Sequence, residues 1–437
     1  MRLIFSLAII AISVTTSSAQ VWSLDKCLSY AMENNLNLKQ SKLNVDLAEL
    51  NKSDGKYAMY PTLNSSSSRS HSYGRAINPL TNSYVSQDVI SINLNANSNV
   101  TVFNGFNRVN NYKSTVQSLE AEKLSLEKSR NDIALMVINA YLNLLYNQDL
   151  LRVANEQLEV TKTQLDRSQK NAAVGNATEG DVLNIKSQVA TDELNVTTAQ
   201  NNLDLAKLDL IQLLDRDPGE VFEVERPQNV EKYLTANTSA TLYDVYGKAE
   251  LNLPDIKLLE YRYNAAKYGL AAAKGSLYPR LSLGAGLGSD YADLNPLSFR
   301  NQLDLNFSQF WQFSLSVPIF NGFSARNNMK RASVNMASAD INLQQAKLTL
   351  SKSVQQAISD LKAANKKYES TIKNNQSLKE AFKYSQQRFD VGLLNAVDYG
   401  IAKNNVARSE ADVVQAKYEL ILRAKLLDFY NGNPLTF

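Results

Sequence analysis

The five residues VFNGF at positions 102–106 return almost unchanged as IFNGF at positions 319–323, 217 positions later. Three more stretches recur in the same order and at nearly the same spacing. They are LDKCLSYAMENNLNLK (24–39) with LYDVYGKAELNLPDIK (242–257), YAMYPTLNSS (57–66) with GSLYPRLSLG (275–284), and VGNATEGDVL (174–183) with VGLLNAVDYG (391–400). Such a series indicates a tandem internal duplication of one unit, whose period is too long for a solenoid. We predict a first repeat at 20–217, a linker at 218–241 and a second repeat at 242–437.

Each repeat is predicted to contain a helix, two β-strands and a long helical hairpin. The stretch 89–103 alternates apolar residues with serine, asparagine and threonine, which is the period of a strand. A similar alternation covers 279–291. Another covers 311–320, where the last apolar residue of the alternation is Ile319. A fourth strand is predicted to follow Pro61. The stretch 89–103 exceeds the ~5–6 residues usual in globular sheets and fits a tilted membrane strand of ~9–11 residues with an extension. Taken alone, the strands fit an ordinary sandwich core equally well.

A helical pattern follows each FNGF stretch. In the first repeat it runs from about 107 to 173, turns at VG, and returns from about 179 to 214. The second repeat does the same as far as about 389 and back to about 430. At a rise of 1.5 Å per residue, each long helix would measure roughly 100 Å. Leucines at every seventh residue are typical of a coiled coil. They are Leu144, Leu151, Leu158 and Leu165.

The FNGF stretch lies where a strand gives way to a long helix. Gly105 and Gly322 permit backbone conformations that other residues resist. Asn104 and Asn321 are candidates to cap the start of each helix. We therefore predict a strand-to-helix junction at these residues, once in each repeat.

The chain begins with Arg2, an apolar run, and small residues at Ser17 and Ala19. This pattern is typical of a secretory signal peptide, here over 1–19, although a buried first strand is an alternative interpretation. The apolar run is shorter than the ~20 residues that a membrane-spanning helix needs. We expect the mature chain to leave the cytoplasm.

Residues that carry chemistry are few. The 437-residue sequence has one histidine, His71, and one cysteine, Cys27. These counts exclude an intrachain disulfide, a histidine-based catalytic triad and zinc sites with several Cys or His ligands. The acidic residues are scattered along helical faces, so a site made of carboxylates alone is formally open but disfavoured. We predict that the chain is not an enzyme and has no cofactor or metal site, and we expect Cys27 to be half-buried in a helix.

The net charge and the strand count bear on the partners of the chain. The formal net charge of +3 gives no indication of a nucleic-acid partner. Four strands are too few to close a membrane barrel, for which ~8 is the practical minimum. Because lipid does not tolerate open sheet edges, we expect the protein to oligomerise. Three copies would supply twelve strands, and their polar faces would line an aqueous lumen.

Each repeat contains, in order, a strand that follows YP, a strand that ends in VFNGF or PIFNGF, and a long hairpin with a VG tip. This duplicated order resembles the outer-membrane efflux protein family, the TolC-like channels. The stretch 24–39 resembles the family's opening helix, and RFDVGLLNAVDYG (388–400) resembles its second hairpin tip. The resemblance implies a mixed α/β membrane protein that forms a homotrimer in the outer membrane. Its twelve-stranded β-barrel, with four strands from each chain, would continue into a long periplasmic α-helical barrel.

The resemblance also implies a function. The chain would be the outer-membrane channel of a tripartite efflux or type I secretion system. A periplasmic adaptor (membrane fusion) protein would join it to an inner-membrane pump of RND or ABC type. Drug efflux, metal efflux and protein secretion use similar outer components, so the cargo stays open.

Two sets of site residues follow from the same resemblance. The adaptor would dock at the hairpin tips, which are Val174, Gly175 and Asn176 in the first repeat and Val391, Gly392 and Leu393 in the second. Asn176 departs from the leucine that the family has there. A periplasmic gate would involve Asp398, its repeat partner Asp181, and Ile401, which replaces an acidic residue of the best-known member. The alternative role for Asp398 is to cap the returning helix near its N-terminus.

One interpretation from a different class competes with the channel. A secreted or periplasmic coiled-coil protein with a structural or adhesive role would explain the signal peptide and the heptads. It would not explain amphipathic strands at matching places in both repeats.

Overall fold

The structure, a computed structural model, describes residues 21–78, 81–175, 177–217, 219, 222–227 and 241–435. The predicted signal peptide, Asn176 and most of the predicted linker lie outside these described residues. The chain forms two compact units, and each unit takes segments from both repeats. The hairpin unit comprises the described residues within Met1–Gln40, Lys128–Leu253 and Thr349–Phe437. The sheet unit comprises those within Ser41–Glu127 and Pro254–Leu348.

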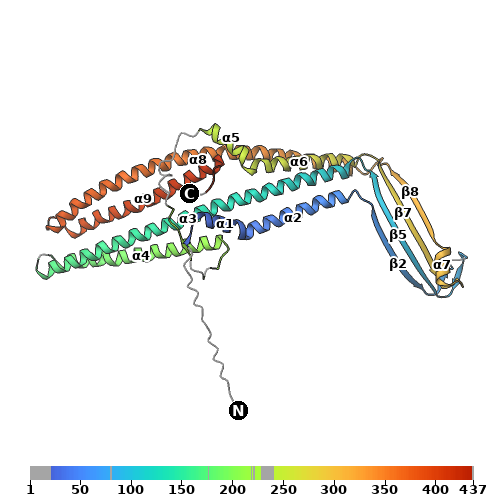
Figure 1. Ribbon diagram of the computed structural model, residues 1–437, viewed down its shortest axis with the longest axis horizontal. Coiled ribbons are helices and arrows are strands. Elements are labelled where there is room, and N and C mark those ends of the chain that lie inside the picture. The colour runs from blue at the N-terminus through green and yellow to red at the C-terminus, as the bar shows by residue number, and fades with distance from the viewer. Residues whose placement is uncertain are drawn as a thin grey trace, which may run out of the picture. The chain divides into compact units, whose positions relative to one another are not determined.

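The sheet unit contains the four predicted strands in one antiparallel sheet (Figure 1). Its order is β2-β5-β7-β8, so each repeat provides one central and one edge strand. The strands are β2 (Thr62–Ser72), β5 (Val89–Phe103), β7 (Arg280–Ala292) and β8 (Ser308–Ser316). Beside them, β3 (Arg75–Ile77) and β4 (Tyr84–Ser86) form a two-stranded ribbon, and α7 (Phe299–Leu305) is a short helix before β8.

The register of the ladder gives strands β5, β7 and β8 a common apolar face. Side chains of directly paired residues lie on the same side of a sheet. Val100 pairs with Leu283, and Leu283 pairs with Phe313, so these three share a face. Asn97 pairs with Gly286 on the opposite face, which carries the other asparagines of β5 at alternate positions. The edge strand β2 is different, because it carries mostly serine on both faces.

Strand β8 begins and ends earlier than predicted, at Ser308–Ser316. The alternation of side chains was expected to continue to Ile319, but the strand ends at Ser316. Pro318 follows closely, and proline has no N–H group to donate to a ladder. In the first repeat β5 continues to Phe103, directly before the junction. The second junction is therefore more open, and Ile319 is 94% exposed.

The helices repeat as the duplication predicts. They are α1 (Leu24–Asn34), α2 (Leu36–Tyr57), α3 (Asn107–Ala173) and α4 (Glu179–Leu213) in the first repeat, and α5 (Leu242–Asn252), α6 (Pro254–Gly275), α8 (Ser324–Asp390) and α9 (Ala396–Asn431) in the second. Helices α3 and α8 each have 67 residues, and α4 and α9 have 35 and 36. In the described part of the chain, no helix combines the length and apolar character needed to cross a membrane.

Within the sheet unit, the helices follow the order of the strands. Gly55 of α2 lies against Thr115 of α3. The hydroxyl of Ser114 on α3 donates to a main-chain carbonyl of α6 at 2.8 Å. Lys347 of α8 pairs with Glu260 of α6 at 3.7 Å. Helices α2 and α8 are thus the edge helices, just as β2 and β8 are the edge strands.

The hairpin unit packs the α3–α4 and α8–α9 hairpins with α1 and α5 around an apolar core (Figure 1). The heptad leucines follow this core only in part, because Leu144 is buried but the other three are half-buried. Toward the hairpin turns, the buried positions are often polar instead. They include Thr161, Gln164, Ser168, Asp192, Lys403 and Ser409.

The opening helix predicted for the first repeat is interrupted at Asn35, between α1 and α2. Asn35 Nδ2 donates to Leu213 O at 3.0 Å, and the Leu36 N–H donates to Asp215 Oδ2 at 2.8 Å. The last residue of α4 and Asp215 just beyond it therefore accept the hydrogen bonds that compensate the break. Cys27 on α1 is fully buried rather than half-buried as expected, and burial raises the pKa of its thiol to about 12.

The described part of the linker is tied to the first residues of the described chain. Strand β6 (Glu223–Val224) pairs in parallel with β1 (Val21–Trp22). The Trp22 ring packs against Phe222 at 5.5 Å between centroids. The Tyr141 hydroxyl on α3 donates to the main-chain carbonyls of Trp22 in β1 and of Glu225, directly after β6.

Candidate functional site at the helical hairpin tips

Both hairpins turn at a VG pair with the same geometry. Gly175 and Gly392 have φ angles of +80° and +74°, in the left-handed region that other L residues avoid. The Gly175 N–H donates to Ala172 O, and the Gly392 N–H donates to Phe389 O, each at 3.0 Å. Glycine therefore ends α3 and α8 as a left-handed helix cap.

The turns present apolar side chains to solvent. Val174, Val391 and Leu393 are each more than two-thirds exposed. Exposed apolar side chains that are gathered at one place often mark contact with another protein. Asn176, the remaining predicted docking residue, lies outside the described residues.

The predicted gate aspartates both take part in helix caps. The Asp181 N–H donates to Thr178 Oγ1 at 3.1 Å, and the Thr178 N–H donates to Asp181 Oδ2 at 3.3 Å. In the second hairpin, the Asp398 N–H donates to Asn395 Oδ1 and Asn395 Nδ2 donates to Asp398 Oδ2, each at 2.8 Å. A carboxylate in the first turn of a helix is stabilising. Asp398 and Ile401 are exposed, and Asp181 is half-buried.

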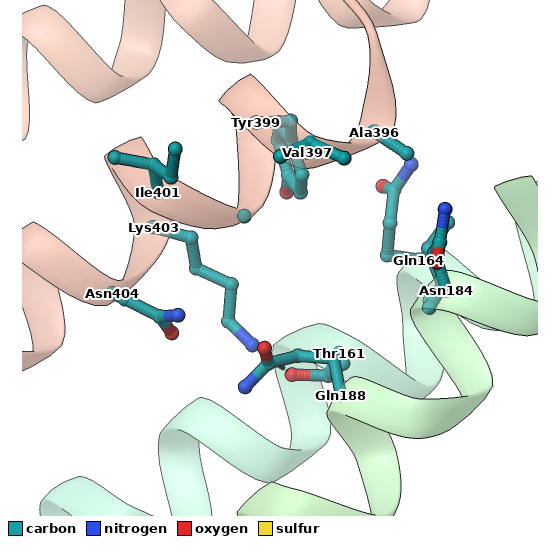
Figure 2. A pocket seen from close by; sticks show the side chains of 12 residues that line it. Thr161, Gln164, Asn184, Gln188, Ala396, Val397, Tyr399, Ile401, Lys403 and Asn404 are labelled. Carbon is teal, nitrogen blue, oxygen red and sulfur yellow. Dashed lines mark hydrogen bonds between the residues drawn. The ribbon is translucent and has the colours of Figure 1, made fainter.

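A buried ion pair that sequence reasoning missed joins the two hairpins. Lys403 on α9 and Asp192 on α4 each have side chains 3% exposed, with Nζ 2.8 Å from Oδ2. The Thr161 hydroxyl on α3 donates to Asp192 and accepts from Lys403. Gln188 Nε2 donates to Asp192 Oδ1 at 2.9 Å. We call these four residues the Lys403 cluster, and Figure 2 shows Lys403 extending toward Thr161 and Gln188.

The Lys403 cluster holds two charged side chains away from water. Removal from water lowers the pKa of the Lys403 ammonium, and the hydrogen bond and charge of Asp192 oppose that shift. Both Asp192 oxygens accept hydrogen bonds, and Lys403 Nζ donates to Thr161 and to Asp192. Such a network fixes one arrangement of its helices, whereas loss of a single partner leaves a buried charge uncompensated.

A cavity of about 260 Å³ lies beside the Lys403 cluster, lined by residues of α3, α4 and α9 (Figure 2). Tyr399 lines it and is 4% exposed, with its ring stacked on Phe389 at 4.6 Å between centroids. Among the residues that the structure describes, the Tyr399 hydroxyl has no hydrogen-bond partner. Burial raises the pKa of Tyr399 to about 12. The predicted gate residue Ile401 also lines this cavity.

The predicted strand-to-helix junctions lie in the sheet unit. Gly105 and Gly322 have φ angles of +62° and +63°. The residues that follow them, Phe106 and Phe323, share the left-handed conformation, which the sequence did not predict. Asn104 Oδ1 accepts from the N–H group four residues later at 3.4 Å.

The two junction glycines have different surroundings. A Cβ atom on Gly105 would lie 2.4 Å from the carbonyl oxygen of Gly275, at the end of α6. A Cβ atom on Gly322 would meet no described atom within 4 Å. The first junction is therefore packed inside the chain, and the second is open.

The chain resembles known proteins over nearly its whole length. Residues 27–216 and 245–433 each match the family described as outer membrane efflux protein, one match in each repeat. Toxin and drug export protein A of Aggregatibacter actinomycetemcomitans is 25% identical over 317 residues, which cover 71% of this chain and 64% of that protein. Outer membrane efflux protein BepC of Brucella suis is 20% identical over 414 residues, which cover 95% of this chain and 86% of that protein.

A solved structure shows the same fold. The outer membrane protein VceC of Vibrio cholerae matches with a TM-score of 0.80 and 17% identity, over 94% of this chain and 96% of that one. The duplicated family match, the four-stranded sheet and the paired long hairpins agree with one another. The chain therefore belongs to the outer membrane efflux protein family and is an outer-membrane protein with the fold of that family's channels.

Proposed function

We propose that the chain is the outer-membrane channel component of a tripartite efflux or type I secretion system. Three copies close a twelve-stranded barrel, and their hairpins surround a periplasmic tunnel. An inner-membrane pump of RND or ABC type delivers the cargo through a periplasmic adaptor protein.

The observation that carries this proposal is the pair of unpaired sheet edges. Every residue of β2 and of β8 is exposed, and neither strand has a second neighbour among the described residues. Lipid does not tolerate strand edges with free N–H and C=O groups. Four strands are also half of the ~8 that the smallest barrels contain. Pairing β8 of one copy with β2 of the next removes every edge.

The edge helices also expose surfaces that fit a neighbouring copy. On α2, Leu43, Leu50 and Tyr57 recur at seven-residue spacing, and each is more than half exposed. On α8, an equivalent exposed stripe consists of Val334, Ile341 and Leu348. Heptad stripes of this kind are typical of helices that pack on a partner. A neighbouring copy offers its α8 stripe to α2, just as it offers β8 to β2.

The open second junction supports the same assembly. In the duplication, the end of α2 corresponds to the end of α6, against which Gly105 packs. A neighbouring copy would place its α2 end beside Gly322. The open space at Gly322 is then filled by the next chain.

Electron microscopy of the detergent-extracted protein tests the assembly. We expect threefold particles with a long helical tube and a short barrel at one end, and single-channel currents in planar bilayers. Leu50→Lys is expected to abolish the threefold particles because it places a charge in the stripe, while Asn51→Lys, at the next exposed position, leaves them intact. Monomeric rods or filaments from the unaltered protein would reject the proposal.

In this assembly, the adaptor docks on the exposed apolar tips, and the gate lies at Asp398, Asp181 and Ile401. Three Asp398 carboxylates around one axis repel one another, and a bound cation relieves that repulsion. Asp398→Ala is expected to weaken block by multivalent cations in planar bilayers. Asn395→Ala is the matched control, since it removes the cap partner but keeps the carboxylate. Equal cation block in both variants and the unaltered protein would leave Asp398 with the capping role alone.

A further inference from the structure

In the four described strands, the apolar face of the sheet carries a single permanent charge. Arg69 of β2 pairs with Ile92, and Ile92 pairs with Tyr291, so Arg69 lies on the apolar face. His71 lies on the same face, where it pairs with Ile90. Among the strand residues that the structure describes on this face, there is no aspartate or glutamate and no second lysine or arginine.

The duplication shows what this face carries where the charge is absent. Arg69 corresponds to Leu287 at an offset of 218 positions, the same as that of the two YP pairs. Their ladder partners, Ile92 and Gln309, are 217 positions apart, so the register agrees with this correspondence. On β7, this face carries Leu281, Leu283, Ala285 and Leu287. The corresponding residues of β2 are Leu63, Ser65, Ser67 and Arg69. The first repeat therefore has a charge where the second has an apolar side chain.

Aromatic residues mark both ends of the apolar face. Phe103 pairs with Leu281 near the junctions, and Tyr291 lies ten residues farther along β7. Ten residues of a strand tilted by about 40° cross about 25 Å, which is the height of the apolar band in outer-membrane barrels. Tyr73 corresponds to Tyr291 and follows β2 at the same end of the sheet, beside α7 (Figure 1).

Arg69 lies inside this apolar band. It precedes Tyr73 by four residues, which correspond to about 10 Å of depth at the same tilt. An arginine near the edge of such a band extends its charge to the interface, while its aliphatic carbons stay among apolar groups. His71 lies between Arg69 and Tyr73, and its ring centroid is 4.1 Å from that of Tyr73. Both side chains are therefore within reach of the level of the lipid headgroups.

The charge of Arg69 needs an anion close to it, because an unpaired guanidinium in hydrocarbon is costly. Arg69 is exposed, and the structure shows no ion pair or hydrogen bond between its side chain and another described residue. The β8 strand of a neighbouring copy offers no acid on this face, where it carries Gln309, Trp311, Phe313 and Leu315. The charge of Arg69 thus fits an anion that the membrane itself supplies.

We propose that Arg69, with His71 beside it, binds the phosphate of a lipid in the outer leaflet of the outer membrane, at one site in each copy. The inference rests on the three-copy barrel proposed above, which turns the apolar face toward lipid and the end beside α7 toward the exterior. A guanidinium matches a phosphate in geometry, because two parallel N–H groups reach two phosphate oxygens. The acyl chains of the lipid then lie along the apolar residues of β5 and of the next copy's β8.

Native mass spectrometry of the detergent-solubilised threefold particles, titrated with diphosphoryl lipid A, tests the site. Up to three tightly bound lipids per particle are expected. Arg69→Leu introduces the residue of the second repeat and is expected to weaken binding by about tenfold or more, as for the loss of a charged hydrogen-bond donor. Because it removes a charge from the lipid-facing side, this variant is expected to keep the threefold particles. Lipid A without its phosphates is expected to bind equally to both proteins.

Arg75→Leu is the matched control. Arg75 lies in β3, beyond Tyr73, with its guanidinium carbon 4.4 Å from the centroid of the Tyr84 ring. Its loss changes the net charge by the same amount and is expected to leave the affinity for diphosphoryl lipid A unchanged. Leu287→Arg, added to the Arg69→Leu protein, moves the charge to the corresponding position on β7 and is expected to restore binding.

The outcomes separate this inference from the proposed function. If the unaltered protein forms no threefold particles, the proposed function fails. If it forms conducting threefold particles, and Arg69→Leu binds diphosphoryl lipid A as tightly as the unaltered protein, the channel stands and the inference is overturned. An equal loss of affinity in Arg69→Leu and Arg75→Leu would also overturn it, because the lipid would then respond only to net charge.

Discussion

The first and second repeats build the same helices and turns but place different groups at equivalent positions. Both have a left-handed glycine at the hairpin turn, a capped returning helix and an Asn-Gly junction. Only the first buries Asp149 and Asp192, and only the first packs its junction glycine inside the chain. Features common to both repeats determine the fold. In the proposed assembly, features present in one repeat mark the contacts that one chain makes with itself and not with its neighbours.

The largest difference between the repeats is expected at the two equivalent lysines. Lys403→Met is expected to lower the free energy of unfolding by about 3–5 kcal/mol, because it leaves the Asp192 carboxylate buried without its counterion. Lys186→Met is expected to change it by less than about 0.5 kcal/mol, as is usual for an exposed position. Urea unfolding of the detergent-solubilised protein, followed by circular dichroism, measures both values. Equal effects would show that the repeats do not differ here.

The junction glycines give the next largest contrast. Gly105→Ala is expected to cost roughly 3 kcal/mol, since it combines a left-handed alanine with a clash at the Gly275 carbonyl. In the dissociated chain, Gly322→Ala is expected to cost only the ~1–2 kcal/mol of the backbone conformation. In the proposed three-copy assembly, a neighbouring copy would pack on Gly322, so the costs of the two substitutions should become similar. Thermal unfolding of both variants, before and after dissociation, measures the destabilisation that each substitution causes. The prediction is contradicted if Gly322→Ala destabilises the assembled and the dissociated protein equally.

The smallest effect concerns Tyr399, whose equivalent in the first repeat is Val182. Tyr399→Phe is expected to stabilise the protein by up to about 1 kcal/mol, because it removes a buried hydroxyl that has no partner among the described residues. The pKa of Tyr399 rises from 10.0 to about 12 on burial, so the folded state keeps a proton that the unfolded chain loses. This contribution to stability is present below pH 10 and is lost as the pH rises to about 12.

Alkaline unfolding curves check the Tyr399 prediction. The unaltered protein should lose stability relative to Tyr399→Phe between pH 10 and about 12. Parallel curves for the two proteins across that range would show that the hydroxyl is solvated in the folded state.

The long elements were predictable because each extends over many periods of one pattern. The α3 and α8 boundaries follow from the FNGF and VG stretches, which punctuate both ends of a long helical pattern. The interruption at Asn35 was not predictable, because its hydrogen-bond partners lie on and beyond α4 in the sequence. Pro318 indicates in the sequence that β8 ends early, but the predicted strand ran past this residue.

The Lys403 cluster was hidden for a similar reason. Lys403 and Asp192 lie 211 positions apart, and each alone resembles an ordinary charged helix residue. One signal was available, because Lys403 stands at helical spacing from Tyr399 and Val406, both of them buried apolar or aromatic residues. A lysine at such a position points to a buried partner, but which acid it meets depends on how the two hairpins pack.

The discontinuity of both compact units has a consequence for folding. The hairpin unit needs α1, near the start of the chain, and α9, near its end, and the sheet unit interleaves strands from both repeats. Neither repeat can therefore finish folding while the other is still missing. Such long-range pairing is slow, and exposed strand edges promote aggregation until the last partner arrives. The duplication has doubled the structure without creating two independently folding halves.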